Sequence, residues 1–187
     1  MTPLGVPPAG ILLAPGAGAT RDHRTLVALE QGLAPMPVRR IGLPRGAVAA
    51  VAAVREQTAA FAAELGVGTD RLLIGGRSFG GRMCSMATAD GLPVAGLVLL
   101  SYPLHPPGHP DRLRVEHLPR ITVPVLAVSG EQDPFGTPDE LRSHLASVAG
   151  PLTLVLVLGG HAPADGPVVA AVRTWLGLAS ASATIEP

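Results

Sequence analysis

The segment Gly76-Arg77-Ser78-Phe79-Gly80 has the residue types and spacing of a nucleophile elbow, the turn that presents a serine hydroxyl for attack on an acyl carbon. An apolar run, Leu72–Ile74, precedes the turn, and a pattern with helical spacing follows it. A strand that reverses directly into a helix is crowded, so small residues are needed two positions before and after the serine. Both of these positions are glycine, Gly76 and Gly80. The alternative is a plain glycine-rich turn, because this short pattern also occurs by chance.

The same geometry predicts two donors for a developing oxyanion. The helix after the serine directs its first backbone N–H groups toward the attacked group, and Phe79 carries the first of them. The second is expected from Ala17 in the glycine loop after the first apolar run, where Gly16 and Gly18 are candidates for the pocket wall. A phosphate loop is the alternative, but Arg21 occupies the third glycine position of GxGxxG, and without lysine no GxxxxGK[ST] motif exists.

Two later segments supply the groups that activate a serine. Asp133 follows an apolar run, and its carboxylate could accept an imidazole N–H and hold the required tautomer. Glu131 is the reserve candidate for this role, and the alternative for Asp133 is the start of a turn before Pro134. His161 follows the last apolar run and would be the general base. The chain order serine, acid, histidine is that of α/β hydrolases.

Apolar runs alternate with helical patterns along the chain, which predicts an α/β fold with about six mainly parallel strands and helices on both faces. We expect strands at Gly10–Ala14, Val38–Ile41, Arg71–Gly75, Val94–Ser101, Val123–Ser129 and Leu152–Leu158. We expect helices at Asp22–Leu33, Ala47–Leu65, Phe79–Asp90, Pro138–Val148 and Ala164–Leu176. Because the carboxyl ends of parallel strands share one rim, the loops with the candidate residues should converge there.

Three of these segments make sharper predictions. Thr137-Pro138-Asp139-Glu140 combines a cap residue, a proline at the first helical position and a glutamate at the third, so a helix should begin there. Leu152–Leu158 is apolar at all but one position, as expected for a strand covered by helices on both faces. In Ala47–Leu65, an apolar stripe that includes Val48 should leave Arg55 mostly toward solvent.

The composition suits one domain spanning residues 1–187, with 178–187 as a frayed tail. The net charge of zero argues against nucleic acid as a partner, and no stretch approaches the roughly 20 apolar residues of a membrane span. The single Cys84 excludes an internal disulfide and fits a reducing compartment, so we expect a cytoplasmic protein. Cys84 should be a buried thiol, with a reactive thiol as the alternative. The chain indicates neither a cofactor nor a metal site, and it leaves the oligomeric state open.

Several residues near the candidate site could shape its pocket. Arg77 and Arg82 flank the serine, and they indicate either a substrate with a carboxylate or phosphate or, as the alternative, structural ion pairs. Tyr102, Leu104 and His105 should form one wall. Among the other histidines, His23 beside the glycine loop could touch substrate or simply end a helix in solvent, and His109, His117 and His144 compete poorly with His161 as a base.

The chain resembles compact α/β hydrolases of the dienelactone-hydrolase-like type. It is most similar to the branch that contains a testis-expressed hydrolase-like protein and the third subunit of the non-specific lethal chromatin complex. The resemblance covers nearly the whole chain, and it is carried by the segments Pro15–Ala19, Gly75–Met83, Leu99–Gly108, His117–Ile121, Asp133–Leu141 and Gly159–His161.

The resemblance implies Ser78 as nucleophile, Asp133 as acid and His161 as base. The chain has no room for a cap domain, and a long loop, Tyr102–Pro119, replaces the usual helix. A serine also stands where dienelactone hydrolase itself has cysteine, so the lactone reaction is not carried over. We predict a serine hydrolase for small-molecule esters, thioesters or related acyl bonds. The alternative is a catalytically silent relative that binds a partner.

Overall fold

The computed structural model describes residues 4–178. Six parallel strands form one sheet in the order β2-β1-β3-β4-β5-β6. The strands are β1 (Gly10–Ala14), β2 (Val38–Arg40), β3 (Leu72–Arg77), β4 (Gly96–Leu100), β5 (Val125–Gly130) and β6 (Leu152–Val157). The helices are α1 (Arg24–Gly32), α2 (Ala47–Leu65), α3 (Phe79–Ala89), α4 (Pro138–Leu145) and α5 (Asp165–Trp175), with short 3-10 turns η1 (Thr69–Arg71) and η2 (Leu118–Arg120). The predicted α/β fold is confirmed.

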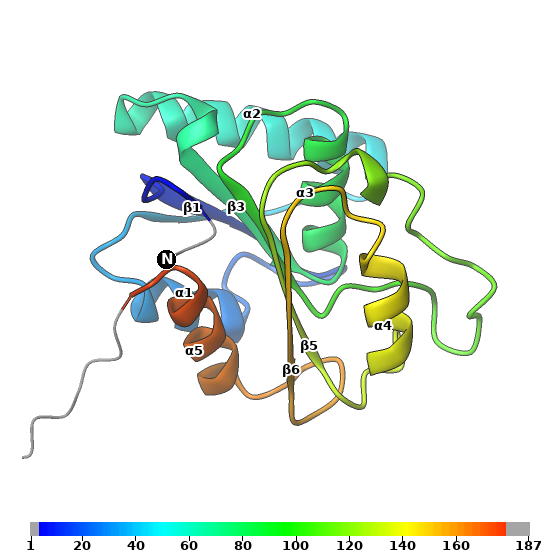
Figure 1. Ribbon diagram of the computed structural model, residues 1–187. Coiled ribbons are helices and arrows are strands. Elements are labelled where there is room, and N and C mark those ends of the chain that lie inside the picture. The colour runs from blue at the N-terminus through cyan, green and yellow to red at the C-terminus, as the bar shows by residue number, and fades with distance from the viewer. Residues whose placement is uncertain (1–3, 179–187) are drawn as a thin grey trace, which may run out of the picture.

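Helices cover both faces of the sheet (Figure 1). On one face α1 and α5 pack together, and their apolar cluster includes Leu13 and Trp175. On the other face lie α2, α3 and α4, where Phe61 and Leu99 belong to a second cluster. With apolar layers on both sides, the central strands β1, β3, β4 and β5 are almost fully buried, as in other sheets of this type.

The order of the strands places two loops side by side. The chain leaves β1 for β2 at one edge of the sheet and then returns to β3 on the opposite side of β1. The loops after β1 and β3 therefore begin at neighbouring carboxyl ends and lead away in opposite directions. Open parallel sheets bind their ligands at such a point, so the fold itself marks the place of a site.

The observed boundaries differ from the predicted ones by a few residues. α1 begins at Arg24 because His23 is its N-cap, with the imidazole accepting the N–H of Thr25. Neither 3-10 turn was expected, since a single turn leaves no periodic pattern. Of the predicted tail 178–187, all but Leu178 lies outside the described residues. Within 4–178, no helix combines the length and apolar character needed to cross a bilayer.

The prediction that helices cover both faces of Leu152–Leu158 is confirmed only in part, because α4 contacts one face of β6 and α5 the other, but the cover is incomplete. β6 is an edge strand that pairs only with β5. Its side chains are only partly buried, Thr153 is exposed, and Leu158 just beyond the strand is 82% exposed. A continuous apolar run predicts a strand with apolar layers on both faces, but it carries no information about how completely those layers cover it.

The predicted exposure pattern of α2 also needs correction. Val48 is 88% exposed because it lies on the outer side of the first turn of α2, whereas Ala47 and Ala50 of the same turn face the apolar layer. Arg55 is half-buried, and its guanidinium donates to the carbonyls of Ala87 and Asp90 at the end of α3. An arginine stem packs well against apolar surface, so its place on a helix is not readable from charge alone.

Two local predictions are confirmed. The Thr137 hydroxyl accepts the N–H of Glu140, and the Glu140 carboxylate accepts the N–H of Thr137, which completes a capping box at the start of α4. Cys84 is a buried thiol that donates to the Gly75 carbonyl at 3.3 Å, and burial raises the pKa of the thiol to about 12. A thiol in that state is not a nucleophile at neutral pH.

The long loop after β4 contains no helix before η2, as predicted, and a buried contact between His117 and Ser85 joins it to α3. The Tyr102 hydroxyl donates to the Arg114 carbonyl at 2.8 Å, and the Ser85 hydroxyl donates to the Arg82 carbonyl at 2.8 Å. His117 Nε2 lies 2.7 Å from the Ser85 oxygen. Because the one Ser85 proton goes to Arg82, His117 carries its N–H on Nε2 and donates to Ser85.

The buried His117 should make stability depend on pH. Burial lowers the pKa of His117 from 6.5 to about 4, and nearby Arg82 and Arg120 act in the same direction. Between these two pH values the unfolded chain binds more protons than the folded one. The contribution of His117 to stability should therefore be fully present above pH 6.5. The free energy of unfolding should fall as the pH drops from there toward 4, by at most about 3 kcal/mol from this residue.

Urea denaturation at about pH 7.5 and about pH 4.5 measures this effect. The control is His117→Gln, which keeps a side-chain N–H donor but cannot titrate. Carboxylates contribute to the acid loss in both proteins, so the difference between them isolates His117. An equal loss of stability in wild type and variant would contradict the prediction.

Candidate active site

Ser78 stands at the apex of the turn between β3 and α3. Its φ of 50° and ψ of −115° lie in a region that residues with side chains avoid. The Ser78 N–H donates to the Leu100 carbonyl at 2.8 Å, which ties the apex to β4. The side chain stands free of both elements, as an elbow requires.

Glycine is needed on both sides of Ser78 because the backbone of β1 passes directly beside the turn. A Cβ at Gly80 would lie 2.5 Å from the carbonyl oxygens of both Ala14 and Pro15. A Cβ at Gly76 would overlap the Ala14 carbonyl oxygen. The glycines around Ser78 are therefore required by the backbone of β1 and of the residue that follows it, as their spacing in the sequence predicts.

The structure brings Ser78, His161 and Asp133 into one hydrogen-bonded chain. His161 Nε2 lies 3.0 Å from Ser78 Oγ, and His161 Nδ1 lies 2.9 Å from each carboxylate oxygen of Asp133. The Asp133 side chain is 1% exposed, and it also accepts the N–H of Phe135 at 2.9 Å. With Nδ1–H facing Asp133, the Nε2 lone pair faces the serine hydroxyl, the geometry a general base requires.

The loops that carry Asp133 and His161 are packed against each other. A Cβ at Gly130, the last residue of β5, would overlap the carbonyl oxygens of Gly159 and Gly160. The Gln132 N–H donates to the Gly159 carbonyl at 2.9 Å. Backbone contact between the two loops therefore sets the distance between the acid and the imidazole.

Two further side chains hold His161 in place. The Arg77 guanidinium donates to the His161 carbonyl at 2.7 Å. The Phe135 ring lies on the imidazole, with ring centroids 4.1 Å apart and planes inclined by 30°. These contacts restrict both the backbone and the ring of His161, so the imidazole is oriented by the protein itself.

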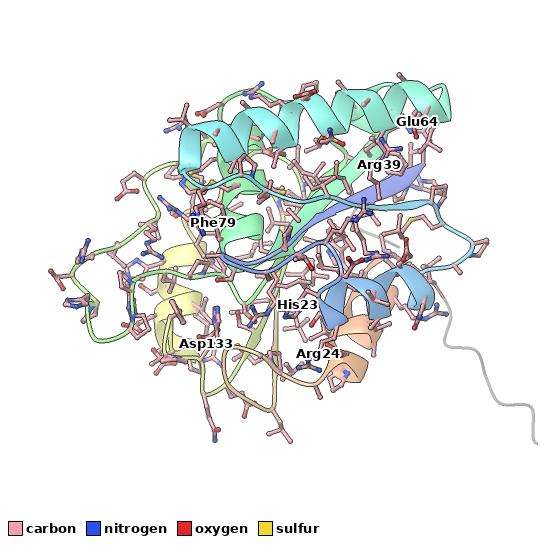
Figure 2. The ribbon with its side chains drawn as sticks, turned by 180° about the vertical axis from the view of Figure 1, so that it is seen from behind. His23, Arg24, Arg39, Glu64, Phe79 and Asp133 are labelled. Carbon is pink, nitrogen blue, oxygen red and sulfur yellow. The ribbon has the colours of Figure 1, made fainter. Side chains whose placement is uncertain are left out.

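The two expected oxyanion donors lie beside Ser78. Phe79 is the first residue of α3, so its N–H has no acceptor within the helix. The loop of Ala17 runs alongside the elbow, since a Cβ at Gly16 would lie 3.6 Å from Ser78 Cβ. Phe79 and Asp133 lie toward the same side of the molecule in Figure 2, away from the Arg39–Glu64 pair at the opposite end of the sheet.

A cavity of about 490 Å³ opens over the serine, a size typical of small-molecule sites. It is lined by Ala17, Arg77, Ser78, Phe79, Arg82, Pro103, Arg114, Phe135 and His161. A second cavity, of about 300 Å³, lies on the other side of Ala17 and Phe79 and includes Gly16 and Gly18 in its wall. The glycine loop thus separates the two cavities.

The prediction that Tyr102, Leu104 and His105 form a pocket wall does not hold. Their exposed fractions are 1%, 0% and 5%, so all three belong to the interior, and Pro103 between them faces the cavity instead. Tyr102 points to the Arg114 carbonyl, a partner too far along the chain for local sequence to reveal.

The sequence interpretation also missed Arg114 and Phe135. Phe135 follows Asp133 by two positions, so its place beside the acid could have been noticed. Arg114 lies in a loop without periodicity, and nothing in the sequence directs it to the cavity. His23, considered as a substrate contact, is the N-cap of α1. Across residues 4–178, no three histidine, cysteine or acidic side chains gather as metal ligands would.

Residues 7–162 match the model of a protein family described as an alpha/beta hydrolase domain. The chain belongs to this family. The hydrolase is also similar in fold to solved structures of low identity. Est1E from Butyrivibrio proteoclasticus has a TM-score of 0.72 at 18% identity, with 94% of this chain and 90% of that one covered. A carboxylesterase from Mesorhizobium loti has a TM-score of 0.70 at 21% identity, with 94% of this chain and 91% of that one covered. A carboxylesterase from Bacillus cereus has a TM-score of 0.67 at 16% identity, with 91% of this chain and 89% of that one covered.

The tight fit of the elbow can be tested with Gly80→Ala. The added methyl would meet two backbone carbonyl oxygens at 2.5 Å, which no side-chain rotation relieves. We expect the free energy of unfolding in urea to fall by about 2 kcal/mol or more. The control is Gly166→Ala in α5, whose Cβ would meet nothing within 4 Å and which should be neutral or slightly stabilising. Equal stability of the two variants would refute the steric account.

Proposed function

We propose that this alpha/beta hydrolase is a serine hydrolase that cleaves a small ester, thioester or related acyl bond. The observation that carries the proposal is the continuous chain from Asp133 through His161 to Ser78, which ends at a cavity of about 490 Å³. Two of the proteins with similar folds are named as carboxylesterases, which is consistent with the proposal.

In the proposed reaction, His161 Nε2 takes the Ser78 proton as the serine oxygen bonds to the acyl carbon. The charge that develops on the carbonyl oxygen is held by the N–H groups of Ala17 and Phe79. His161 then returns the proton to the leaving alcohol or thiol, and an acyl-serine remains. Water, deprotonated by the same imidazole, attacks this acyl group, and the serine regains its proton. Asp133 keeps Nδ1–H in place throughout.

The cavity favours short substrates. The segment between β4 and β5 is a loop that packs on α3, and within residues 4–178 no additional domain covers the cavity. We also propose the narrower kinship with dienelactone-hydrolase-like proteins. The serine nucleophile separates this chain from dienelactone hydrolase itself, so an ester or thioester is the proposed substrate.

A fluorophosphonate probe tests the nucleophile directly. We expect the native protein to be labelled on Ser78, because His161 lies 3.0 Å from its hydroxyl. Ser78→Ala and heat-denatured wild type should not be labelled. If the folded protein never reacts, the chain would instead be a catalytically silent relative that binds a partner.

Asp133→Asn tests the acid separately. The amide oxygen can still accept the Phe135 N–H, but the charge that stabilises the protonated imidazole is gone. We expect kcat on a short ester to fall by about four orders of magnitude, as for the corresponding change in serine proteases. The matched control is Glu131→Gln, two residues earlier and exposed, which should keep full activity. If the Glu131 variant lost activity and the Asp133 variant did not, the assignment would be reversed.

A further inference from the structure

Three arginines line the cavity above Ser78. Arg77 comes from the end of β3, Arg82 from the first turns of α3, and Arg114 from the long loop after β4. None of the nine residues that line this cavity is acidic, since Asp133 lies behind His161. The wall facing the serine therefore carries three positive charges and no carboxylate.

The cavity arginines lack the carboxylate partners that five arginines elsewhere in the described chain have. Arg24, Arg39, Arg40, Arg120 and Arg142 each form an ion pair with a carboxylate. In the part of the chain that the structure describes, no carboxylate lies within ion-pair distance of Arg77, Arg82 or Arg114. Structural ion pairing, the alternative considered for Arg77 and Arg82, is thus not observed.

The guanidinium groups of Arg82 and Arg114 are in an unfavourable position without a ligand. Arg82 Nε is buried, and no hydrogen-bond partner is found for it among residues 4–178. Burial and the neighbouring Arg82 and Arg112 lower the pKa of Arg114. Like charges that repel each other at a half-buried surface are stabilised when an anion binds between them.

The backbones of these two arginines are held by one cluster of buried polar side chains. Ser85 donates to the Arg82 carbonyl and Tyr102 donates to the Arg114 carbonyl. His117 Nε2 contacts both hydroxyl oxygens, at 2.7 Å and 3.5 Å. The cluster therefore brings a helix and a distant loop together in a way that places two cations on one wall.

We infer that the substrate carries a second, anionic group, a carboxylate or a phosphate, which Arg82 and Arg114 bind while Ser78 attacks the acyl carbon. This inference rests on the proposed function and names its substrate class. Arg82 follows Ser78 by four residues, which is about 6 Å along the helix axis, so the anionic group lies a few bonds from the scissile carbonyl. Arg77 adds positive charge beside the triad, where it also holds His161.

Matched esters test the inference. The p-nitrophenyl monoester of glutarate and p-nitrophenyl valerate have acyl chains of equal length and differ in one carboxylate. We expect kcat/KM for the charged ester to be roughly ten- to a hundred-fold higher, the range for hydrogen bonds to charged groups. Acetyl esters of glycerol phosphate and of glycerol form a second pair, which distinguishes a phosphate on the alcohol side from a carboxylate on the acyl side.

The preference should depend on Arg82 and Arg114. In Arg82→Met and Arg114→Met, which keep the length of the stem, we expect the ratio of charged to neutral kcat/KM to approach one. The control is Arg112→Met, on the same loop but exposed and outside the cavity wall, which should keep the wild-type ratio. An active enzyme with no preference for either charged ester, or a preference that survives both cavity substitutions, would overturn the inference.

A binding measurement separates this inference from the proposed function. Glutarate or inorganic phosphate should raise the melting temperature of wild type and of Ser78→Ala, and the rise should be lost in Arg82→Met and Arg114→Met. Absence of labelling at Ser78 with such binding intact would reject only the proposed hydrolysis. Hydrolysis of neutral esters without any stabilisation by either anion would reject only the anionic substrate.

Discussion

A contact between backbone atoms at the end of β1 determines where the candidate catalytic groups can lie. The Ala14 carbonyl approaches Gly76 and Gly80 so closely that neither position can carry a Cβ. This approach forces the chain to reverse at Ser78 with a positive φ, a conformation disfavoured by on the order of 1 kcal/mol or more. Pairing of β3 with both β1 and β4 maintains it. The strained turn lifts the hydroxyl above the sheet and turns the start of α3 toward the cavity.

The same kind of contact recurs at the other side of the site. Gly130 allows the loop after β6 to lie directly on the end of β5, and Asp133 and His161 then meet at 2.9 Å. The chain of hydrogen bonds thus spans three strand ends without a long flexible side chain in it. Because each group is held by backbone packing, the site is oriented in the folded protein before a ligand arrives.

The loop that replaces a helix between β4 and β5 links stability to recognition. A loop leaves backbone carbonyls without helical partners, and here the Tyr102 hydroxyl satisfies that of Arg114. On α3, the Ser85 hydroxyl donates to the carbonyl of Arg82, and both arginine side chains line the cavity. His117 joins the hydroxyls and stays neutral because of burial, so it adds no further positive charge to this wall. One buried cluster therefore holds the loop and positions the two arginines that carry positive charge on the cavity wall.

Local patterns in the sequence were sufficient for the elements and for the candidate triad. A strand that turns directly into a helix has strict steric needs, so the glycines around Ser78 are visible within five residues, and parallel strands bring Asp133 and His161 to the same rim. Exposure was predicted less well: Leu158 and Tyr102 were misplaced, because burial depends on elements far away in the chain.

The sequence by itself thus determined the fold class, the order of the elements and the residues that could form a serine-histidine-acid chain, since these follow from short-range periodicity and strand polarity. Only the tertiary structure decided the character of the cavity. Arg114 reaches the wall because Tyr102 holds its carbonyl from 12 residues away, and none of the residues that line the cavity with Arg82 is acidic. Pairing between side chains is a property of distances in space, which no local pattern encodes.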